Sequence, residues 1–424
     1  MTQSFLRYTR LAIVVTTLAY MWVACVANQE RTDSITVFLI PSPSASAIQT
    51  FVPVFERKTG IEVMVVQAPY GEAHQKLLLA FELGRGAYDV AQFDNIFLAT
   101  FGVSEVMTPL DIYLEDSMEY AIEDFSSSQQ DYGKYAGKTF GLTLSTEPMI
   151  QWYRKDMYDS LGLTPAVTWE EYRDNAKAVH ESGLGDGVIL GWGPNVPWWW
   201  VGLVWSFGGQ LYDEDLIPTV NTPEVIAATT YLKDLLDYGS EGGLSADGDM
   251  VTHKFLSQNI GSMMQFSGYY GMTLDPDNTS HFGLVGTAPM PRGKVDVTHL
   301  AGWNIGIPMD SKKKTAAWRF LEFVLGKTNS KEYLSRGAAA IGRRSITEDP
   351  TLLEKHPYLP HLRLSGDRRI ERYPQLTVWP EFEKSVADAL RPILTGEHTV
   401  NEGLDALQEK LRPLLARERE LLLR

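Results

Sequence analysis

Three apolar segments near the start of the chain alternate with two helical segments, and this order constrains the fold more than any other feature. Residues 35–40 form a continuous apolar run, and the runs 61–66 and 88–93 follow it. Between them, the helical segments 47–59 and 72–83 each end at a glycine, which is typical of a helix C-terminus. Strand–helix–strand–helix–strand order predicts a parallel α/β sheet, and continuous apolar strands predict that both of its faces are buried.

The second half of the chain is richer in helical patterns. Its 424 residues exceed what one ordinary core accommodates, so two domains are expected. Two short segments, 282–285 and 304–307, are predicted to be strands that return to the first domain. The predicted helices, each delimited by glycine, proline, asparagine or a polar cap, are 156–162, 168–182, 197–208, 223–239, 380–394 and 400–423.

The N-terminus has the pattern of an export signal. Arg7 and Arg10 precede an apolar stretch, residues 11–24, that is too short to cross a bilayer comfortably. We therefore expect residues 1–24 to be a signal peptide that is removed on export.

The single cysteine of the chain, Cys25, follows this apolar stretch directly. The run Trp22, Val23, Ala24, Cys25 resembles a bacterial lipoprotein box, although Trp22 replaces the usual leucine. We expect Cys25 to carry lipid and residues 25–33 to form a tether to the membrane. The alternative is an ordinary signal peptide cleaved after Ala27, and either alternative leaves the mature chain without a disulfide.

Composition and motif searches argue against several other functions. The net charge of −15 disfavours nucleic acid and anionic membrane surfaces as partners. No phosphate-binding loop, dinucleotide-binding fingerprint, nucleophile elbow or HExxH pair occurs, so neither a cofactor nor a metal nor catalytic residues are expected. The pair Arg343 and Arg344 falls in a predicted loop and is expected at the surface.

Polar side chains at strand ends are the first candidates for ligand binding. Asp94 and Asn95 directly follow the third predicted strand, at the sheet edge where ligands of open α/β folds bind. A plain helix N-cap is the competing interpretation of this pair. Gly302 and Trp303 similarly precede a predicted strand, where glycine allows close backbone approach.

Tryptophans are concentrated in one segment. Five of the 11 lie between Trp192 and Trp205. An indole can cover the apolar face of a sugar, but helical spacing within the cluster indicates that most of these rings pack in the core. We expect one or two of them, Trp199 among them, to contact ligand.

Several short motifs, in order and spacing, resemble family 1 extracellular solute-binding proteins, the large sugar-binding class of ABC importers. They are Phe-Glu-Arg-Lys-Thr-Gly-Ile-Glu-Val at 55–63, Gly-Ala-Tyr-Asp-Val at 86–90 followed by Asp94, Gln-Trp-Tyr-Arg-Lys-Asp at 151–156, and a segment from Ala301 to Phe320. Together they extend over nearly the whole mature chain.

The resemblance implies a two-lobed, type II-like α/β fold whose lobes are discontinuous in sequence and close on ligand about a hinge. Lobe 1 would comprise residues 34–144 and 294–341, and lobe 2 residues 145–293 and 342–424. The protein would then be a monomeric, exported, lipid-anchored binding protein that delivers a sugar or polyol to the membrane permease subunits of an ABC importer.

The resemblance also implies roles for individual residues. Asp94 and Glu147 would accept hydrogen bonds from ligand hydroxyls, Trp303 would stack on the ligand with the Gly302 backbone close by, and Phe266 or Tyr269 would line the far lobe. Three arginines compete for one ligand contact, and Arg369 is favoured slightly over Arg368 and Arg372. The expected ligand-binding set is completed by Ser44, Asn95 and Trp199.

Two alternatives remain at this stage. The same fold could bind a peptide, an amino acid, a metal or another non-sugar solute, for which a fixed arginine or converging metal ligands would be needed. An exported glycoside hydrolase would need two carboxylates facing each other across the crevice.

Overall fold

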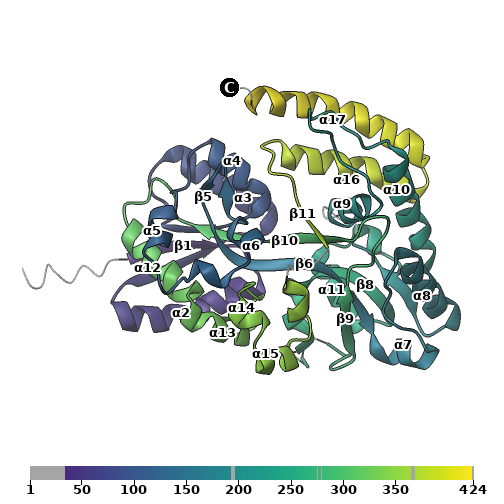
Figure 1. The fold of residues 1–424 in the computed structure, drawn as a ribbon, viewed down its shortest axis with the longest axis horizontal. Helices are drawn as coiled ribbons and strands as arrows, with labels where there is room; N and C mark the ends of the chain where they lie inside the picture. The colour runs from purple at the N-terminus through teal and green to yellow at the C-terminus, as the bar shows by residue number, and fades with distance from the viewer. Residues whose placement is uncertain (1–33, 192–195, 275, 278, 364–367, 423–424) are drawn as a thin grey trace, which may run out of the picture.

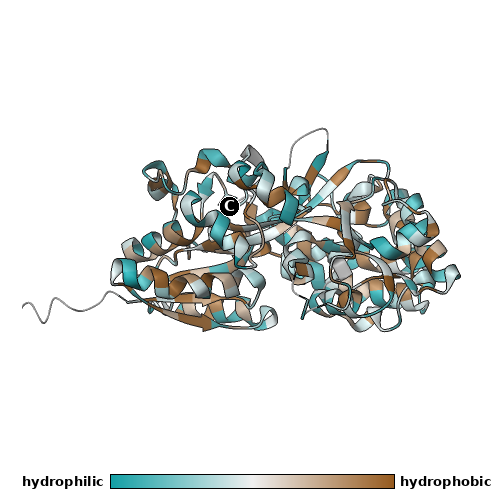
Figure 2. Cartoon of the chain, turned by 90° about the horizontal axis from the view of Figure 1, so that it is seen from below, coloured by the Kyte–Doolittle hydropathy of each residue, from teal (hydrophilic) through white to brown (hydrophobic). Residues whose placement is uncertain are grey.

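Two long strands, β6 (Leu142–Arg154) and β10 (Val297–Gly306), run through both halves of the molecule and join them. The computed structural model describes residues 34–191, 196–274, 276–277, 279–363 and 368–422. The main sheet has the strand order β2-β1-β3-β10-β6-β8-β7, with β11 added to β10 and β9 added to β6. The two lobes lie side by side in Figures 1 and 2, with these strands between them.

The first lobe contains the predicted parallel unit. The strands β1 (Ser34–Leu39), β2 (Glu62–Gln67) and β3 (Val90–Asp94) are parallel, with β1 in the middle. Phe38 packs on one face of the sheet, while Val37 and Leu39 pack on the other, so β1 is buried on both faces as its apolar run predicted. The rest of this lobe is built from α3 (Tyr70–Leu83), α4 (Leu98–Val103), α5 (Asp111–Glu115), α6 (Ser127–Gln130), α12 (Lys314–Leu325), α13 (Lys327–Ser335) and the hairpin of β4 (Lys134–Tyr135) and β5 (Lys138–Thr139).

Local signals set the limits of the first helix, α2 (Pro43–Thr59). The Ser42 side chain accepts a hydrogen bond from the Ala45 amide, and Pro43 occupies the first turn. At the other end Gly60 adopts φ 72°, the left-handed conformation that glycine tolerates best. The predicted helix is therefore confirmed, with its start four residues earlier than expected.

The second lobe is more helical, as predicted. Its C-terminal helices α16 (Trp379–Thr395) and α17 (Val400–Leu422) bury Leu390, Leu404 and Leu411, so they pack against the lobe. The other elements are α7 (Lys155–Leu161), α8 (Trp169–Ser182), β7 (Asp186–Ile189), α9 (Val196–Ser206), α10 (Pro223–Leu235), α11 (Gly248–Ser257), β8 (Ile260–Phe266), β9 (Val285–Pro289), α14 (Arg344–Thr347), α15 (Pro350–Lys355) and β11 (Arg369–Arg372).

The chain crosses between lobes where the long strands change partners. In β6, residues up to Pro148 pair with β10, whereas residues from Met149 onward pair with β8 and β9. A further connection runs from α13 to α14, and there the Thr146 amide donates to the Ala340 carbonyl at 3.2 Å. The lobe boundaries given above remain predictions, with these crossings close to residues 144 and 341.

Two expectations about individual segments are wrong. Phe282 is 56% exposed in a turn, and the strand after it, β9, pairs with the edge of β6 opposite β8 rather than returning to the first lobe. Arg343 is completely buried, with its guanidinium 4.3 Å from the Phe125 ring centroid and one nitrogen donating to the Leu325 carbonyl at 2.6 Å. A cation can be buried there because aromatic faces and carbonyl oxygens replace its water. Arg344 is exposed, as expected.

Among the described residues, no helix is long and apolar enough to cross a membrane. The predicted signal peptide and Cys25 lie outside the described residues.

Candidate functional site

Strand register brings the key polar and aromatic side chains onto one face of the sheet. Trp303 of β10 lies opposite Asp94 of β3 on one side and opposite Ser145 of β6 on the other. Glu147 lies opposite Ala301 in the same ladder. Residues directly opposite each other in antiparallel strands project to the same side, so all of these side chains share one face where the lobes meet.

Tyr70, the first residue of α3, completes the first-lobe side of the site. Its hydroxyl donates to Asp94 Oδ2 at 3.1 Å. Its ring meets the Trp303 indole edge to face, with centroids 5.7 Å apart and planes at 89°. A carboxylate acceptor and two aromatic rings are therefore held in fixed relative positions.

Glu147 stands where β6 passes between the lobes. Its Oε1 accepts from the Ser145 hydroxyl at 2.5 Å. The carboxyl also packs against Gly268, where a Cβ atom would lie 2.3 Å from Glu147 Cδ. Glycine at position 268 thus leaves room for the carboxylate.

Gly302 is required by its conformation and by its neighbours. Its φ is 149°, and a Cβ atom there would lie 2.3 Å from the Ser145 carbonyl oxygen. Its own carbonyl accepts from the Tyr132 hydroxyl at 3.1 Å. Gly302 therefore fixes the backbone of β10 directly before Trp303.

The second lobe contributes a third carboxylate. Glu383 of α16 accepts from Trp198 Nε1 at 2.8 Å, and the Trp198 ring lies 5.7 Å from the Phe266 ring. From the segment before α16, the Arg372 guanidinium lies 5.9 Å from the Tyr132 ring. We call the following residues the interlobe cluster: Tyr70, Asp94, Tyr132, Glu147, Trp198, Phe266, Tyr269, Gly302, Trp303, Arg372, Tyr373 and Glu383.

The three carboxylates of the interlobe cluster hold protons more tightly than free carboxylates do. Burial raises the pKa of Asp94 to about 6, that of Glu147 to about 7 and that of Glu383 to about 8. The negative charge of Asp94 adds to the shift at the other two, so the three groups act on one another. Burial also raises the pKa of the Tyr269 hydroxyl, and the negative charges of Asp249 and Glu147 add to this shift.

The exposure of these side chains indicates that they face solvent from between the lobes. Tyr70, Asp94, Trp303, Trp198 and Glu383 all keep partial exposure, whereas core aromatic residues of the same lobes are completely buried. Carboxylates accept hydrogen bonds, and ring faces cover apolar C–H groups. This arrangement can hold a molecule rich in hydroxyl groups. Among the described residues, no group of three or more histidine, cysteine or acidic side chains is placed to hold a metal ion.

Six residues expected from the sequence meet in this cluster: Asp94, Glu147, Phe266, Tyr269, Gly302 and Trp303. The remaining four have other surroundings. Asn95 is buried and donates to the Tyr132 carbonyl at 2.6 Å, and Trp199 is 7% exposed in the core. Ser44 is buried, and its hydroxyl accepts from the Ala339 amide at 3.2 Å. Arg369 is exposed and pairs with Glu371.

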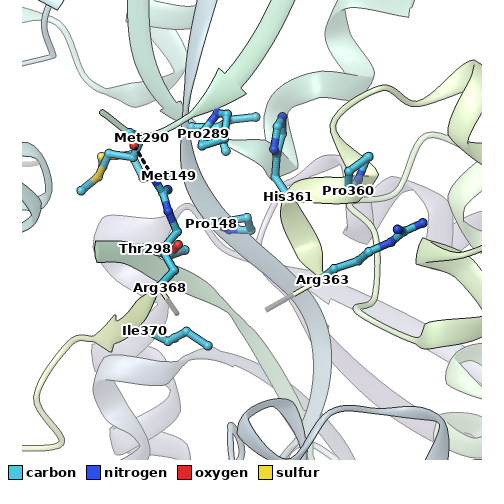
Figure 3. A pocket seen from close by; sticks show the side chains of 11 residues that line it. Pro148, Met149, Pro289, Met290, Thr298, Pro360, His361, Arg363, Arg368 and Ile370 are labelled. Atoms are coloured by element: carbon cyan, nitrogen blue, oxygen red, sulfur yellow. Dashed lines mark hydrogen bonds between the residues drawn. The ribbon is translucent and has the colours of Figure 1, made fainter. Parts of the chain in front are cut away.

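The neighbouring Arg368 belongs to a different place, a pocket of about 140 Å³ beside the crossing of β6. Figure 3 shows Arg368 extended toward the Met290 carbonyl, to which it donates at 2.9 Å, and it also pairs with Asp296 at 2.7 Å. Pro148 lines this pocket next to Glu147, and successive strand side chains point to opposite faces. The pocket therefore lies on the other side of β6 from the interlobe cluster. Of the three competing arginines, Arg372 is the one that the structure brings to the cluster.

Several cluster residues were not anticipated: Tyr70, Tyr132, Trp198, Tyr373 and Glu383. Tyr70 had a usable signal, because it follows the second parallel strand at the same sheet edge as Asp94. Trp198 was within the tryptophan segment, but helical spacing did not reveal which ring faces the site. Glu383 sits in an ordinary amphipathic helix, and no local pattern marks it.

The fold and site define a two-lobed binding protein whose functional groups meet between the lobes. Residues 41–331 match the family model described as bacterial extracellular solute-binding protein, and the chain belongs to this family. The family resemblance and the two-lobed fold expected from the sequence are thus confirmed. Members of this family bind solutes outside the cytoplasm, so this chain is a binding protein and not a glycoside hydrolase.

Similar proteins cover nearly the full chain. A "probable amino-acid ABC transporter periplasmic-binding protein" of Sinorhizobium fredii is 25% identical over 86% of this chain and 85% of its own length. A mannitol-binding protein of Pseudomonas aeruginosa is 24% identical over 89% of this chain and 92% of its own. The crystal structure of an ABC transporter solute-binding protein from Agrobacterium radiobacter, in complex with ribitol, superposes with a TM-score of 0.83 at 24% identity, covering 90% and 98% of the two chains.

Proposed function

We propose that this protein captures a sugar or polyol between its lobes and delivers it to the membrane subunits of an ABC importer. The observation that carries the proposal is the convergence of Asp94, Glu147 and Trp303 on one face of adjacent strands, where the lobes meet. Carboxylates suit the hydroxyl rim of a polyol, and the indole suits its C–H face. The mannitol-binding relative and the ribitol complex have ligands of this chemical class.

Closure of the lobes would couple binding to delivery. Two contacts already join the lobes: the Gln375 side-chain amide of lobe 2 donates to the Lys134 carbonyl of lobe 1 at 3.1 Å, and Arg372 lies over the Tyr132 ring. A ligand that contacts Asp94 in lobe 1 and Glu383 in lobe 2 stabilises the closed state, because only that state makes both sets of contacts. The permease subunits would then recognise the closed protein.

The location follows from the same family membership. The protein acts outside the cytoplasm. We propose that it acts as a monomer and that lipid on Cys25 anchors it to a membrane. Replacing Cys25 by serine is expected to abolish labelling by a radioactive fatty acid and to release the protein into the soluble fraction. Persistent labelling of Cys25→Ser, or unchanged membrane association, would contradict the anchor.

Calorimetric titration tests the binding function directly. Purified mature protein is titrated with ribitol, D-mannitol, D-glucose and maltose, and tryptophan fluorescence is followed in parallel. Saturable binding of at least one of these compounds is expected. Absence of any saturable signal, together with native mass spectrometry that finds an amino acid or peptide on the purified protein, would instead favour the non-sugar solute class to which the Sinorhizobium relative is assigned.

A further inference from the structure

We infer that the interlobe cluster selects uncharged polyols and rejects analogues of the same carbon skeleton that bear a carboxylate or phosphate. The inference rests on the proposed function, since it concerns the ligand class of the same site. It is carried by the placement of three carboxylates from three separate parts of the chain around one site.

Among the described residues, none of the three carboxylates forms an ion pair with a lysine or arginine. Each carboxylate accepts a hydrogen bond from a nearby side chain. The Tyr70 hydroxyl donates to Asp94, and the Ser145 hydroxyl donates to Glu147. The Trp198 indole nitrogen donates to Glu383. All three donors are neutral groups, so none of these hydrogen bonds brings a positive charge to a carboxylate. Above its raised pKa, each carboxylate therefore presents its negative charge to the ligand.

A polyol and its anionic analogue meet this charge differently. Each hydroxyl of a polyol can donate one hydrogen bond to a carboxylate oxygen, so donors on the ligand match acceptors on the protein. An additional carboxylate on the ligand brings no donor and places like charges a few ångströms apart in a partly desolvated site. At an effective dielectric constant of about 20, one such contact at about 5 Å lowers affinity by roughly 100-fold or more.

Among the residues that define the interlobe cluster, Arg372 is the only cation, and one positive charge does not balance three acids. Its guanidinium lies 5.9 Å from the Tyr132 ring, and its Nη1 is buried without a hydrogen-bond partner among the described residues. Its positive charge acts on the Tyr132 hydroxyl and on the Glu371 carboxyl. One arginine at the margin leaves the site with an excess of negative charge, in the same direction as the net charge of −15 of the whole chain.

The decisive comparison uses three ligands with one skeleton: D-mannitol, the neutral D-mannonamide and the anionic D-mannonate. Each is titrated calorimetrically into the wild-type protein at pH 9, where all three carboxylates are ionised. The amide controls for size, because it differs from the acid mainly in charge. We expect the amide to bind within about 10-fold of mannitol and the acid to bind at least 100-fold more weakly than the amide. Equal affinities for acid and amide would overturn the inference.

Should mannitol and the amide both fail to bind, ribitol, ribonamide and ribonate provide the same comparison.

A matched pair of variants assigns the discrimination to the cluster. Glu383→Gln removes one charge while keeping an acceptor for Trp198, and it is expected to reduce the acid-to-amide ratio by about 10-fold. Glu381→Gln, on the exposed side of the same helix, should leave the ratio unchanged. If the two variants behave alike, the inference is wrong. If no neutral polyol or sugar binds to the wild-type protein, the proposed function itself fails, which is a distinguishable result.

Discussion

The indole of Trp303 and the carboxylate of Asp94 lie directly opposite each other on the antiparallel strands β10 and β3, and Tyr70 contacts both. An apolar ring face and an anionic acceptor are thus held side by side by the backbone ladder rather than by flexible loops. Precise binding needs such rigid placement, because each freely rotating side chain that must be ordered lowers affinity.

The Asp94 carboxylate is expected to be a principal acceptor for ligand hydroxyls. Asp94→Asn keeps the size of the side chain but removes its charge, and hydrogen bonds to charged groups contribute about 1.5–3 kcal/mol. The affinity for the best-bound polyol should therefore fall by roughly 10- to 100-fold, as measured by calorimetric titration. Asp116→Asn, at an exposed position of the same lobe, is the control and should bind normally. A normal affinity of Asp94→Asn would remove this residue from the site.

Glu383 should make the ligand-free protein less stable as pH rises. Burial raises its pKa from 4.5 to about 8, so the folded protein keeps a proton that the unfolded chain releases near pH 4.5. The favourable contribution of the protonated form is fully present below pH 4.5 and is lost as pH rises to about 8. Glu383→Gln does not titrate, so its Tm relative to wild type should increase over this range, by on the order of 2 °C.

Scanning calorimetry at pH 5, 6, 7, 8 and 9 measures this difference, with Glu381→Gln as the exposed control on the same helix. Asp94 and Glu147 titrate in both proteins, so subtracting the wild-type curve removes their own contributions and leaves the titration of Glu383 with its coupling to Asp94. A pH-independent Tm difference would show that Glu383 is ionised already at low pH.

Gly302 should be far less replaceable than Gly283, a surface glycine that also has a positive φ. Alanine at 302 would add left-handed strain and a collision with the Ser145 carbonyl, 2.3 Å from the new Cβ atom. Gly283 also has positive φ, 75°, but no atom lies within 4 Å of a Cβ built there. We expect Gly283→Ala to lower the free energy of unfolding by about 1 kcal/mol and Gly302→Ala by about 2 kcal/mol or more.

Chemical denaturation measures both values, and calorimetric titration should in addition show weaker ligand binding by Gly302→Ala, because Trp303 is displaced. Equal destabilisation by the two substitutions would indicate that the strand relaxes to accommodate the methyl group.

The hydrogen bond between Gln375 and the Lys134 carbonyl should favour the closed state. A neutral hydrogen bond contributes about 0.5–1.5 kcal/mol, so Gln375→Ala is expected to weaken ligand binding by roughly 2- to 10-fold. Small-angle scattering should show a larger radius of gyration for this variant at partial ligand saturation. Gln49→Ala is the matched control, because the exposed Gln49 amide donates to the Ala45 carbonyl within its own helix. An unchanged affinity would mean that the bond contributes equally to the open and closed states.

Much of the fold was predictable because the relevant signals act between neighbours in the chain. The apolar run before Pro41 defined β1, and Gly60 ended α2 in a left-handed conformation that other residues rarely adopt. The capping box of α8, in which Thr168 and Glu171 bond each other's backbone, likewise lies within four residues. Asp94, Gly302 and Trp303 were identifiable for the same reason, since each stands at the end of, or just before, a predicted strand.

The remaining features depend on contacts between distant segments. Whether Trp198 or Trp199 faces the site depends on how α9 packs, because that helix is apolar on nearly all sides. The sequence pattern placed Arg343 at the surface, whereas in the structure the Phe125 ring and the Leu325 carbonyl contact its buried guanidinium.

The sequence by itself thus determined the parallel α/β unit, the two-lobed family fold and the acid and indole at the sheet edge. Only the tertiary structure decided that Glu383, from the far end of the chain, joins Asp94 and Glu147 as a third acid. The physical reason is that caps and hydrophobic periodicity are set by local backbone geometry. The charge presented to a ligand is set by strand register and by the approach of two lobes, which involve residues that no local pattern connects.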